Sequence, residues 1–246
     1  MHKEEKMKKN LWTKLVTGLL FWGIVQSASA TTIDYNLSNE WSDTSNPNGV
    51  WAFYSGTTLM TIHHYWYETN VWDINGTTNP SWAKRNVVES GWNDSQVGDI
   101  VAQAWWYGTE STNVTWTSPL DGVIDIFGRS WDTYGQWNDQ GLGRDGGWSL
   151  DVNDVVIAQR NNIATLTRDQ IGANFADNLL VGMSLNNITV NAGDVVKFSA
   201  VGRSTSGVDL NISLNTSPSA VPEPGTILLL GSALIGLAGI NRKKII

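Results

Sequence analysis

A strict alternation of apolar and polar residues near the end of the chain most constrains its fold. From Val208 to Asn215, every apolar side chain falls on one face of an extended segment and every polar side chain on the other. This period of two is typical of a β-strand that buries one face and exposes the other. Further upstream, Val196, Phe198 and Ala200 alternate with polar neighbours in the same way. The sequence therefore predicts a protein built from sheets.

Turn-forming residues separate the apolar runs throughout the middle of the chain, where Gly, Asn, Thr and Ser are frequent. Asn191-Ala192-Gly193-Asp194 and Asn153-Asp154 each lie between two apolar runs, which indicates that the chain reverses direction there. This spacing predicts about eight to ten short strands and an all-β sandwich. The two predicted hairpins pair residues 185–190 with 195–201 and residues 148–152 with 155–158, and residues 100–107 and 122–128 are further predicted strands.

A series of short motifs runs in order from Trp116 to Leu214. It consists of Trp116–Gly128, Asp145-Gly146-Gly147 before the hairpin at 148–158, Val190–Phe198, and Val208-Asp209-Leu210. This order resembles the exported jelly-roll domains that occur beside carbohydrate-active enzymes and are similar to carbohydrate-binding modules. The resemblance implies a jelly-roll-like β-sandwich. Residues 46–51 look like the start of the same arrangement, whereas residues 55–110 depart from it.

The N-terminus has the three parts of a secretory signal peptide. Five lysines within residues 3–14 accompany an apolar run from Leu15 to Val25, and the small residues Ala28 and Ala30 follow at the positions that a signal peptidase recognises. The apolar run is short for a membrane span of about 20 residues, which argues against an uncleaved anchor. We therefore expect residues 1–30 to direct export and to be removed.

The C-terminus combines a proline-flanked glutamate, an apolar segment and a basic end. Pro222-Glu223-Pro224 favours an exposed, extended linker, because proline is excluded from helix interiors and from central strands. Residues 226–240 are apolar and predict a single transmembrane helix, with tilt or bilayer thinning to accommodate its length. The basic cluster Arg242, Lys243 and Lys244 belongs on the cytoplasmic face. On these grounds alone the segment is a C-terminal membrane anchor.

The same three parts, in this order, resemble the PEP-CTERM sorting signal. The resemblance implies processing by an exosortase, a membrane transpeptidase of Gram-negative bacteria that make exopolysaccharide. Pro222, Glu223 and Pro224 would then be recognised by that enzyme. The chain would be anchored in the membrane transiently, before it reaches the cell surface or the extracellular matrix of a biofilm. The predicted organisation is a signal peptide at 1–30, a β-sandwich domain at 31–216 and a sorting signal at 217–246.

Charge and cysteine content narrow the classes of partner. The termini contain eight of the sixteen Lys and Arg residues and three of the twenty-three Asp and Glu residues, which leaves residues 31–221 with eight basic and twenty acidic side chains, a net charge of −12. A domain this acidic repels nucleic acid and anionic lipid, and neutral glycans, cations or proteins are better partners. The absence of cysteine excludes disulfides, a thiol nucleophile and cysteine metal sites.

Tryptophan is the outstanding feature of the composition, with fourteen residues in the chain. Its ring stacks well on a sugar ring, but tryptophan also packs into protein cores. Trp116 and Trp148 begin apolar strands, so we assign them to the core. Four others lie in polar surroundings, two of them within residues 130–147 and two close to Tyr65 and Tyr67. The candidate sugar-binding residues are therefore Trp66, Trp72, Trp131 and Trp137.

The sequence contains no pattern that specifies a catalytic or metal site. His63 and His64 are adjacent, so on a strand they point to opposite faces and are poorly placed to share a metal. No serine-nucleophile elbow, zinc-protease helix or P-loop is present, so no residue is assigned a catalytic role. We predict no cofactor and no metal ligand set, with one structural Ca²⁺ site left open, for which oxygen ligands could come from Asp132, Asn138, Asp139 and Asp145.

Three hypotheses of function follow. The main one is an exported, non-catalytic surface or matrix protein that binds polysaccharide. The second is a glycoside hydrolase or lyase that acts on exopolysaccharide, which would need two carboxylates facing each other across the bond. The third is a structural protein that associates with itself. The expected partners are an exosortase, polysaccharide and, through the C-terminal helix, the membrane; nucleic acid is not expected, and the oligomeric state stays open.

Overall fold

Fourteen strands account for nearly all regular structure in the part of the chain that the computed structural model describes. That part comprises residues 30–66, 69–76, 80–87, 95–104, 111–133, 146–163, 166–202 and 205–216. The chain divides into two compact units, one formed by Thr32–Thr216 and the other by Met1–Thr31 with Ser217–Ile246. The predicted signal peptide, linker, transmembrane helix and basic end lie outside the described residues. Within the described ranges, no helix has the length and apolarity needed to cross a membrane.

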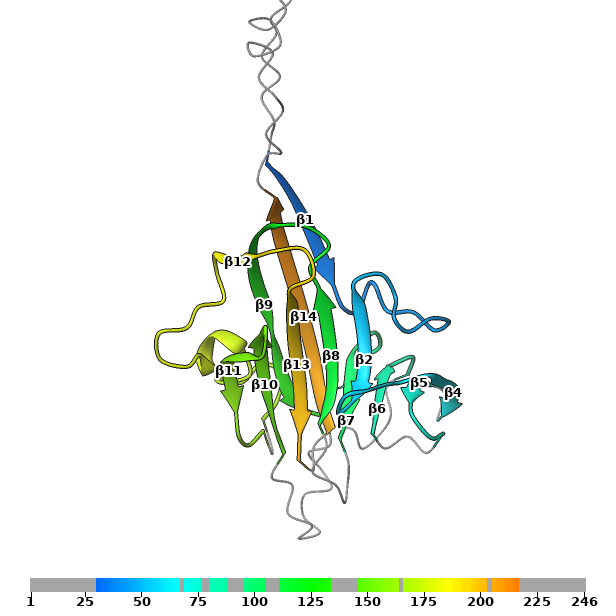
Figure 1. The fold of residues 1–246 in the computed structure, drawn as a ribbon. Coiled ribbons are helices and arrows are strands. Elements are labelled where there is room, and N and C mark those ends of the chain that lie inside the picture. The colour runs from blue at the N-terminus through cyan, green and yellow to red at the C-terminus, as the bar shows by residue number, and fades with distance from the viewer. Residues whose placement is uncertain are drawn as a thin grey trace, which may run out of the picture. The chain divides into compact units, whose positions relative to one another are not determined.

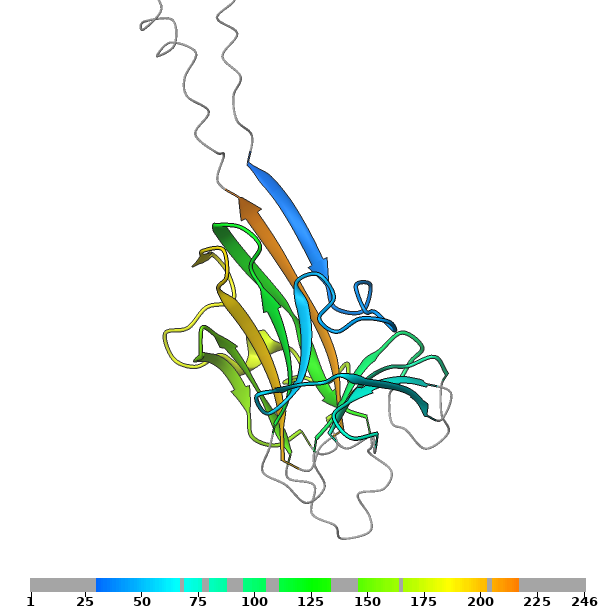
Figure 2. The ribbon, with the colours of Figure 1, turned by 45° about the vertical axis from the view of Figure 1, so that its right-hand side comes forward.

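The larger of two sheets has eight strands and contains both ends of the Thr32–Thr216 unit. Its long central strands β9 (Gly122–Asp132) and β14 (Thr205–Thr216) pair along ten positions, from Ser206 opposite Asp132 to Asn215 opposite Val123. β1 and β14 lie side by side, so the first and last described strands meet at one end of the unit (Figure 2). In spatial order the strands are β12 (Ile188–Val190), β9 (Gly122–Asp132), β14 (Thr205–Thr216), β7 (Ile100–Gln103), β6 (Ser81–Lys84), β5 (Thr69–Asp73) and β4 (Ile62–Trp66), with β1 (Thr31–Asn36) pairing with β14.

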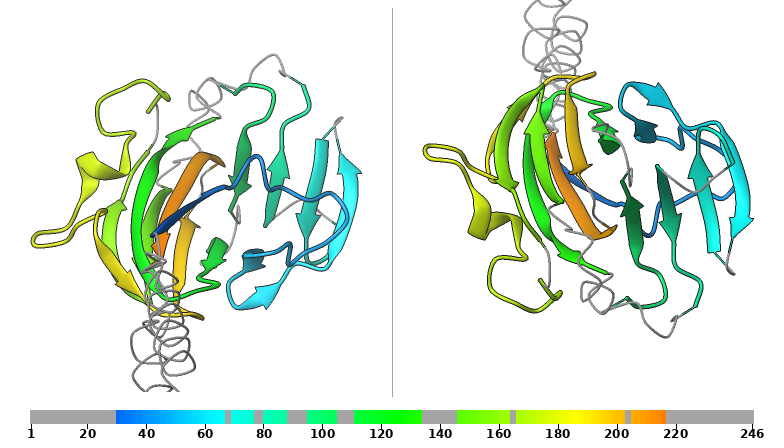
Figure 3. Two further views of the ribbon diagram at one scale, coloured as in Figure 1. Left: turned by 90° about the horizontal axis from the view of Figure 1, so that it is seen from above. Right: turned by 90° about the horizontal axis from the view of Figure 1, so that it is seen from below.

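The second sheet has six strands and forms the other layer (Figures 1 and 3). It is antiparallel, and a short 3-10 helix, η2 (Phe175–Asn178), lies in the connection that follows its edge strand β11. In spatial order its strands are β11 (Val155–Arg160), β10 (Gly147–Val152), β13 (Val195–Val201), β8 (Thr112–Thr117), β2 (Trp51–Ser55) and β3 (Thr58–Leu59). The chain is therefore an all-β sandwich of the jelly-roll-like kind, as the sequence predicted.

Aromatic side chains fill the space between the sheets. Trp82, from the eight-stranded sheet, packs against Phe53 and Phe198 of the six-stranded sheet, with ring centroids 5.6 and 6.3 Å away. Trp148 stacks on Phe198 at 6.0 Å and meets Phe175 of η2 edge-on at 5.1 Å. Such offset and edge-on pairs add to the stabilisation that burial alone provides. The predicted core positions Trp116 and Trp148 are buried, which confirms both assignments.

The alternating segments have the predicted faces. Val208, Leu210, Ile212 and Leu214 are buried while the residues between them are partly exposed. The hairpin predicted at 148–158 is confirmed, because β10 and β11 pair through a turn at Asn153 and Asp154. Both turn residues have positive φ, 50° and 63°, which suits a two-residue turn between twisted strands.

The second predicted hairpin is wrong. The turn at Asn191–Asp194 does form, with the Asp194 amide donating to the Asn191 carbonyl at 3.0 Å. However, β12 before it pairs with β9 in the eight-stranded sheet, and β13 after it pairs with β8 and β10 in the six-stranded sheet. The turn therefore passes the chain from one layer to the other. A turn signal specifies a reversal of direction, but it does not specify which strand becomes the neighbour.

Candidate functional site

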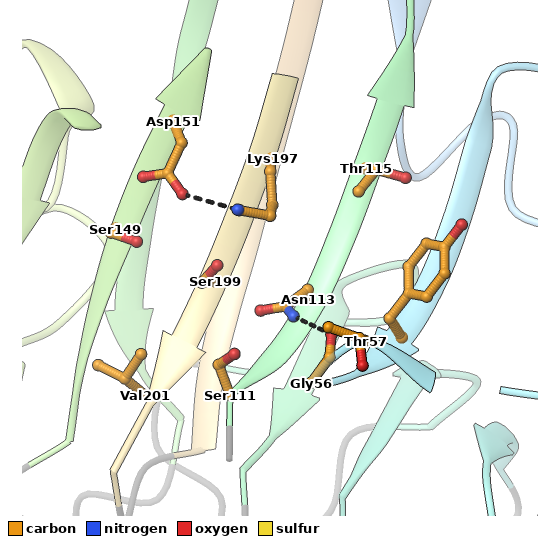
Figure 4. A pocket seen from close by; sticks show the side chains of 11 residues that line it. Gly56, Thr57, Ser111, Asn113, Thr115, Ser149, Asp151, Lys197, Ser199 and Val201 are labelled. Carbon is orange, nitrogen blue, oxygen red and sulfur yellow. Dashed lines mark hydrogen bonds and ion pairs between the residues drawn. The ribbon is translucent and has the colours of Figure 1, made fainter. Parts of the chain in front are cut away.

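An open groove of about 500 Å³ lies on the outer face of the six-stranded sheet (Figure 4). Strands β10, β13, β8 and β2 form its floor, and the turn after β2 contributes its far end. Most of its lining residues carry polar, uncharged side chains, and a carboxylate and an ammonium group lie at one end. We call it the polar groove, and its lining residues are Tyr54, Gly56, Thr57, Ser111, Asn113, Thr115, Ser149, Asp151, Lys197, Ser199 and Val201.

Strand register places these side chains in rows across the sheet. One row consists of Ser149, Ser199, Asn113 and Tyr54, each opposite the next on the neighbouring strand. Asp151, Lys197 and Thr115 form the next row. Because side chains alternate along a strand, the intervening residues point to the core. The alternation that builds the core therefore also gathers hydroxyl, amide and charged groups on the outside.

Two side chains at the floor of the groove are buried yet incompletely hydrogen-bonded. Asn113 and Asp151 are each 6% exposed. The Asn113 amide nitrogen donates to the Gly56 carbonyl at 2.7 Å, and Asp151 Oδ2 lies 3.3 Å from Lys197 Nζ. In both residues Oδ1 has no hydrogen-bond partner among the described residues. An unpaired buried acceptor costs free energy, so each of these atoms lacks a donor that the described residues do not supply.

The ammonium group of Lys197 interacts with two carboxylates. Its ammonium donates to Asp154 Oδ1 at 2.7 Å and lies near Asp151. The hydrogen bond to Asp154 raises the pKa of Lys197 above its usual value, burial opposes this, and Asp151 adds to the increase. The same hydrogen bond lowers the pKa of Asp154, although Asp154 is 90% exposed. Lys197 therefore stays charged, and the two carboxylates occupy two of its three donor hydrogens.

Two of the four tryptophans predicted to bind sugar are buried. Trp72 on β5 is 4% exposed, and its Nε1 donates to the Ser42 carbonyl at 2.8 Å. Trp131 at the end of β9 is fully buried, with the Arg168 guanidinium 4.0 Å from the ring centroid. The ring also lies against Gly207, where an added Cβ would come within 2.3 Å of it. Neither ring has a free face for a sugar in this structure.

The remaining predicted positions are only partly described. Trp66 lies on β4, but its side chain is outside the description, as is all of Trp137. His63 packs on Trp72 at 4.9 Å, whereas His64 Nδ1 lies 3.3 Å from Asp73 Oδ2. Of the possible calcium ligands, Asp132 is buried at the end of β9, and Asn138, Asp139 and Asp145 are outside the described residues. Of the described side chains among these positions, His63, His64 and Asp132 do not line the polar groove.

Sequence reasoning missed the residues that line the groove. The available signal was the polar half of each alternating strand, such as Asn113 and Thr115 in β8 or Lys197 and Ser199 in β13. That signal indicates which residues point outward, but it does not predict which strands become neighbours. β8, β10 and β13 become neighbours only through pairings between distant parts of the chain.

The fold and the groove define an all-β sandwich with a polar depression on one sheet. Comparison with known families adds the C-terminal segment: residues 220–243 match the PEP-CTERM protein-sorting motif. The match includes Pro222, Glu223, Pro224, Arg242 and Lys243, with Lys244 one residue beyond it. The motif indicates an exosortase substrate that is exported, processed at the membrane, and then located at the surface or outside the cell.

Two other comparisons were made. No curated protein sequence matches the chain. Among solved structures, the crystal structure of a Podospora anserina GH26-CBM35 beta-(1,4)-mannanase is similar at 10% sequence identity and a TM-score of 0.30, over 70% of this chain and 29% of that chain. The chain thus corresponds to less than a third of that enzyme's length. A likeness of this size carries no information about what the chain binds.

Proposed function

We propose that the exported domain is a non-catalytic polysaccharide-binding module and that the polar groove is its binding site. The observation that carries this proposal is the pair of buried, unpartnered oxygens of Asn113 and Asp151. Sugars present many hydroxyl donors, and the hydroxyls of Ser149, Ser199 and Thr115 beside these oxygens can both donate and accept. Tyr54 adds an aromatic ring of the kind that packs on sugar faces.

The charges in the groove favour binding over hydrolysis. A glycosidase needs two carboxyl groups at the scissile bond, one acting as a protonated acid and the other as a base or nucleophile. Asp151 is the carboxylate among the described lining residues, and its Oδ2 is engaged by Lys197. The other lining side chains are neutral. This arrangement suits a fixed hydrogen-bonding surface.

The test is affinity electrophoresis of the exported protein through gels that contain a panel of polysaccharides, including the host's own exopolysaccharide. We expect at least one polymer to retard the wild-type protein and Tyr54→Ala to reduce the retardation. Phe127→Ala is the matched control, because Phe127 is an aromatic residue on the outer face of the other sheet and is 50% exposed. Unretarded migration of the wild-type protein in every gel would remove the proposal.

We further propose that residues 226–240 anchor the chain only until exosortase acts. The matched sorting motif and the apolar composition of the segment support this. Protein released by the native host should lack the C-terminal segment, whereas the same chain made in a host without exosortase should remain in the membrane fraction. Mass spectrometry of the released protein measures this directly, and a C-terminus that still ends at Ile246 would identify an ordinary anchor.

A further inference from the structure

We infer that the polar groove selects neutral glycans, at least two sugar rings long, that cross the strands, and that it rejects acidic glycans through Asp151 and Asn113. This inference rests on the proposed function, because it describes the ligand of the same groove. It is derived from which atoms are left unpaired there. Both unpaired atoms are oxygens, so both can only accept hydrogen bonds while Asp151 is ionised.

Acceptors of this kind distinguish between sugars. A hydroxyl group donates to them, whereas the carboxylate of a uronic acid offers only further acceptors and a like charge. Placing like charges together at a binding site lowers affinity. Lys197 does not compensate for the added charge, because its ammonium lies between the carboxylates of Asp151 and Asp154 and these three side chains together have a net negative charge. The groove therefore disfavours acidic rings locally, in addition to the acidity of the domain as a whole.

The separation of the two acceptors gives the minimum ligand length. Asp151 lies on β10 and Asn113 on β8, with β13 between them (Figure 4). Adjacent strands are about 4.8 Å apart, so the two side chains are separated by roughly 10 Å across the strands. They also lie in different rows, two residues apart along the strands, which increases the distance between them. A single sugar ring cannot reach both. A glycan that satisfies both oxygens must therefore run across the strands, over Ser199 and Lys197 of β13.

The decisive experiment uses a polyuronate and the neutral polymer made from it by reducing its carboxyl groups. The linkage and ring geometry of the two polymers are the same, so only the acid groups differ. Calorimetric titration of the exported protein at raised salt, where long-range repulsion is screened, should show the neutral polymer binding at least about tenfold more tightly. Asp151→Asn should reduce this preference below about threefold, because an amide can donate to a carboxylate. Asp169→Asn removes an equally charged group, which pairs with Arg129 on the other sheet, and should leave the preference for the neutral polymer unchanged.

The outcomes separate the two claims. If the acidic polymer binds as tightly as its reduced form, the inferred selectivity is wrong and polysaccharide binding stands. If Asp169→Asn lowers the preference as much as Asp151→Asn does, net charge is the cause and the local mechanism is wrong. With oligosaccharides of the neutral polymer, affinity should rise steeply from one ring to two or three; a single ring that binds as tightly as a trisaccharide would overturn the two-point contact. If neither polymer nor any other glycan binds, the proposed function itself fails.

Discussion

Two outward-facing surfaces, one on each sheet, satisfy their polar side chains in different ways. On the eight-stranded sheet, cross-strand side chains of β1 and β14 bind each other, and Asp209 continues the network to Arg129 on β9. We call this network the polar ladder, and its cross-strand pairs are Thr32 with Asn215 at 2.5 Å, Asp34 with Ser213 at 2.5 Å, and Asn36 with Asn211. On the six-stranded sheet, the rows of the polar groove leave Asn113 Oδ1 and Asp151 Oδ1 unpaired.

Under the proposed function, this difference distinguishes a structural surface from a binding surface. None of the described side chains of the polar ladder has a buried polar atom without a partner. A network in which every polar group is hydrogen-bonded stabilises the fold and leaves a ligand no unpaired donor or acceptor to bind. In the groove, the same residue types are buried without full satisfaction, at a cost that ligand binding can remove. Two faces of similar composition are therefore expected to contribute separately to stability and to binding.

The largest expected effect is a contrast between two asparagine substitutions, one of which should weaken glycan binding and the other protein stability. Asn113→Ala removes a ligand acceptor from the groove and should weaken polysaccharide binding about fivefold, which corresponds to one neutral hydrogen bond of about 1 kcal/mol. Its net effect on stability should be small, because removal of an unpaired buried oxygen offsets the loss of the hydrogen bond to the Gly56 carbonyl. Calorimetric titration against the polysaccharide identified in the retardation assay measures the first effect, and urea unfolding the second.

Asn211→Ala is the matched variant in the polar ladder. It removes the bonds to Asn36 and Asp209, so unfolding should become easier by about 1 kcal/mol while glycan affinity is unchanged. The contrast between the two faces fails if Asn211→Ala weakens binding as much as Asn113→Ala does. It also fails if Asn113→Ala lowers stability and leaves affinity unchanged.

The sequence predicted features that depend on near neighbours in the chain. Alternation placed Val208–Leu214 on one face, and the Asn153-Asp154 turn specified a hairpin whose strands pair. Both depend on residues within a few positions of each other. The failed hairpin at 185–201 and the burial of Trp131 have the opposite cause. Strand β12 pairs with β9, and Trp131 packs beneath Arg168, through contacts between distant parts of the chain that no local pattern contains.

The groove was beyond sequence prediction for the same reason. Asn113 and Asp151 are ordinary outward residues of two strands when each is considered alone. They become a site because β13 lies between β8 and β10, and because burial leaves one oxygen of each side chain unpaired. Tryptophan content says little about the outward-facing residues of the described sheets, since Trp51, Trp82 and Trp116 serve the core.

The smallest expected effect is that of replacing Asp154, which lies beside the groove and pairs with Lys197. Asp154 is exposed, and solvent screens its ion pair with Lys197, so Asp154→Asn should change stability only slightly.

The direction of the pH dependence is nevertheless defined. The pKa of Asp154 is lowered from 3.8, so its contribution is present above that value and is lost as the pH falls through the pKa in the folded protein. The pKa of Lys197 is raised from 10.5, so its contribution is present below 10.5 and is lost as the pH rises through its folded value. The small difference in unfolding free energy between wild type and Asp154→Asn should therefore be constant from about pH 5 to about pH 9 and shrink at both extremes. Urea unfolding across this range measures it, together with an NMR titration of Lys197, whose pKa should fall towards 10.5 in the variant. A difference that grows as the pH falls below 3.8 would show that the Lys197–Asp154 pair does not act as described.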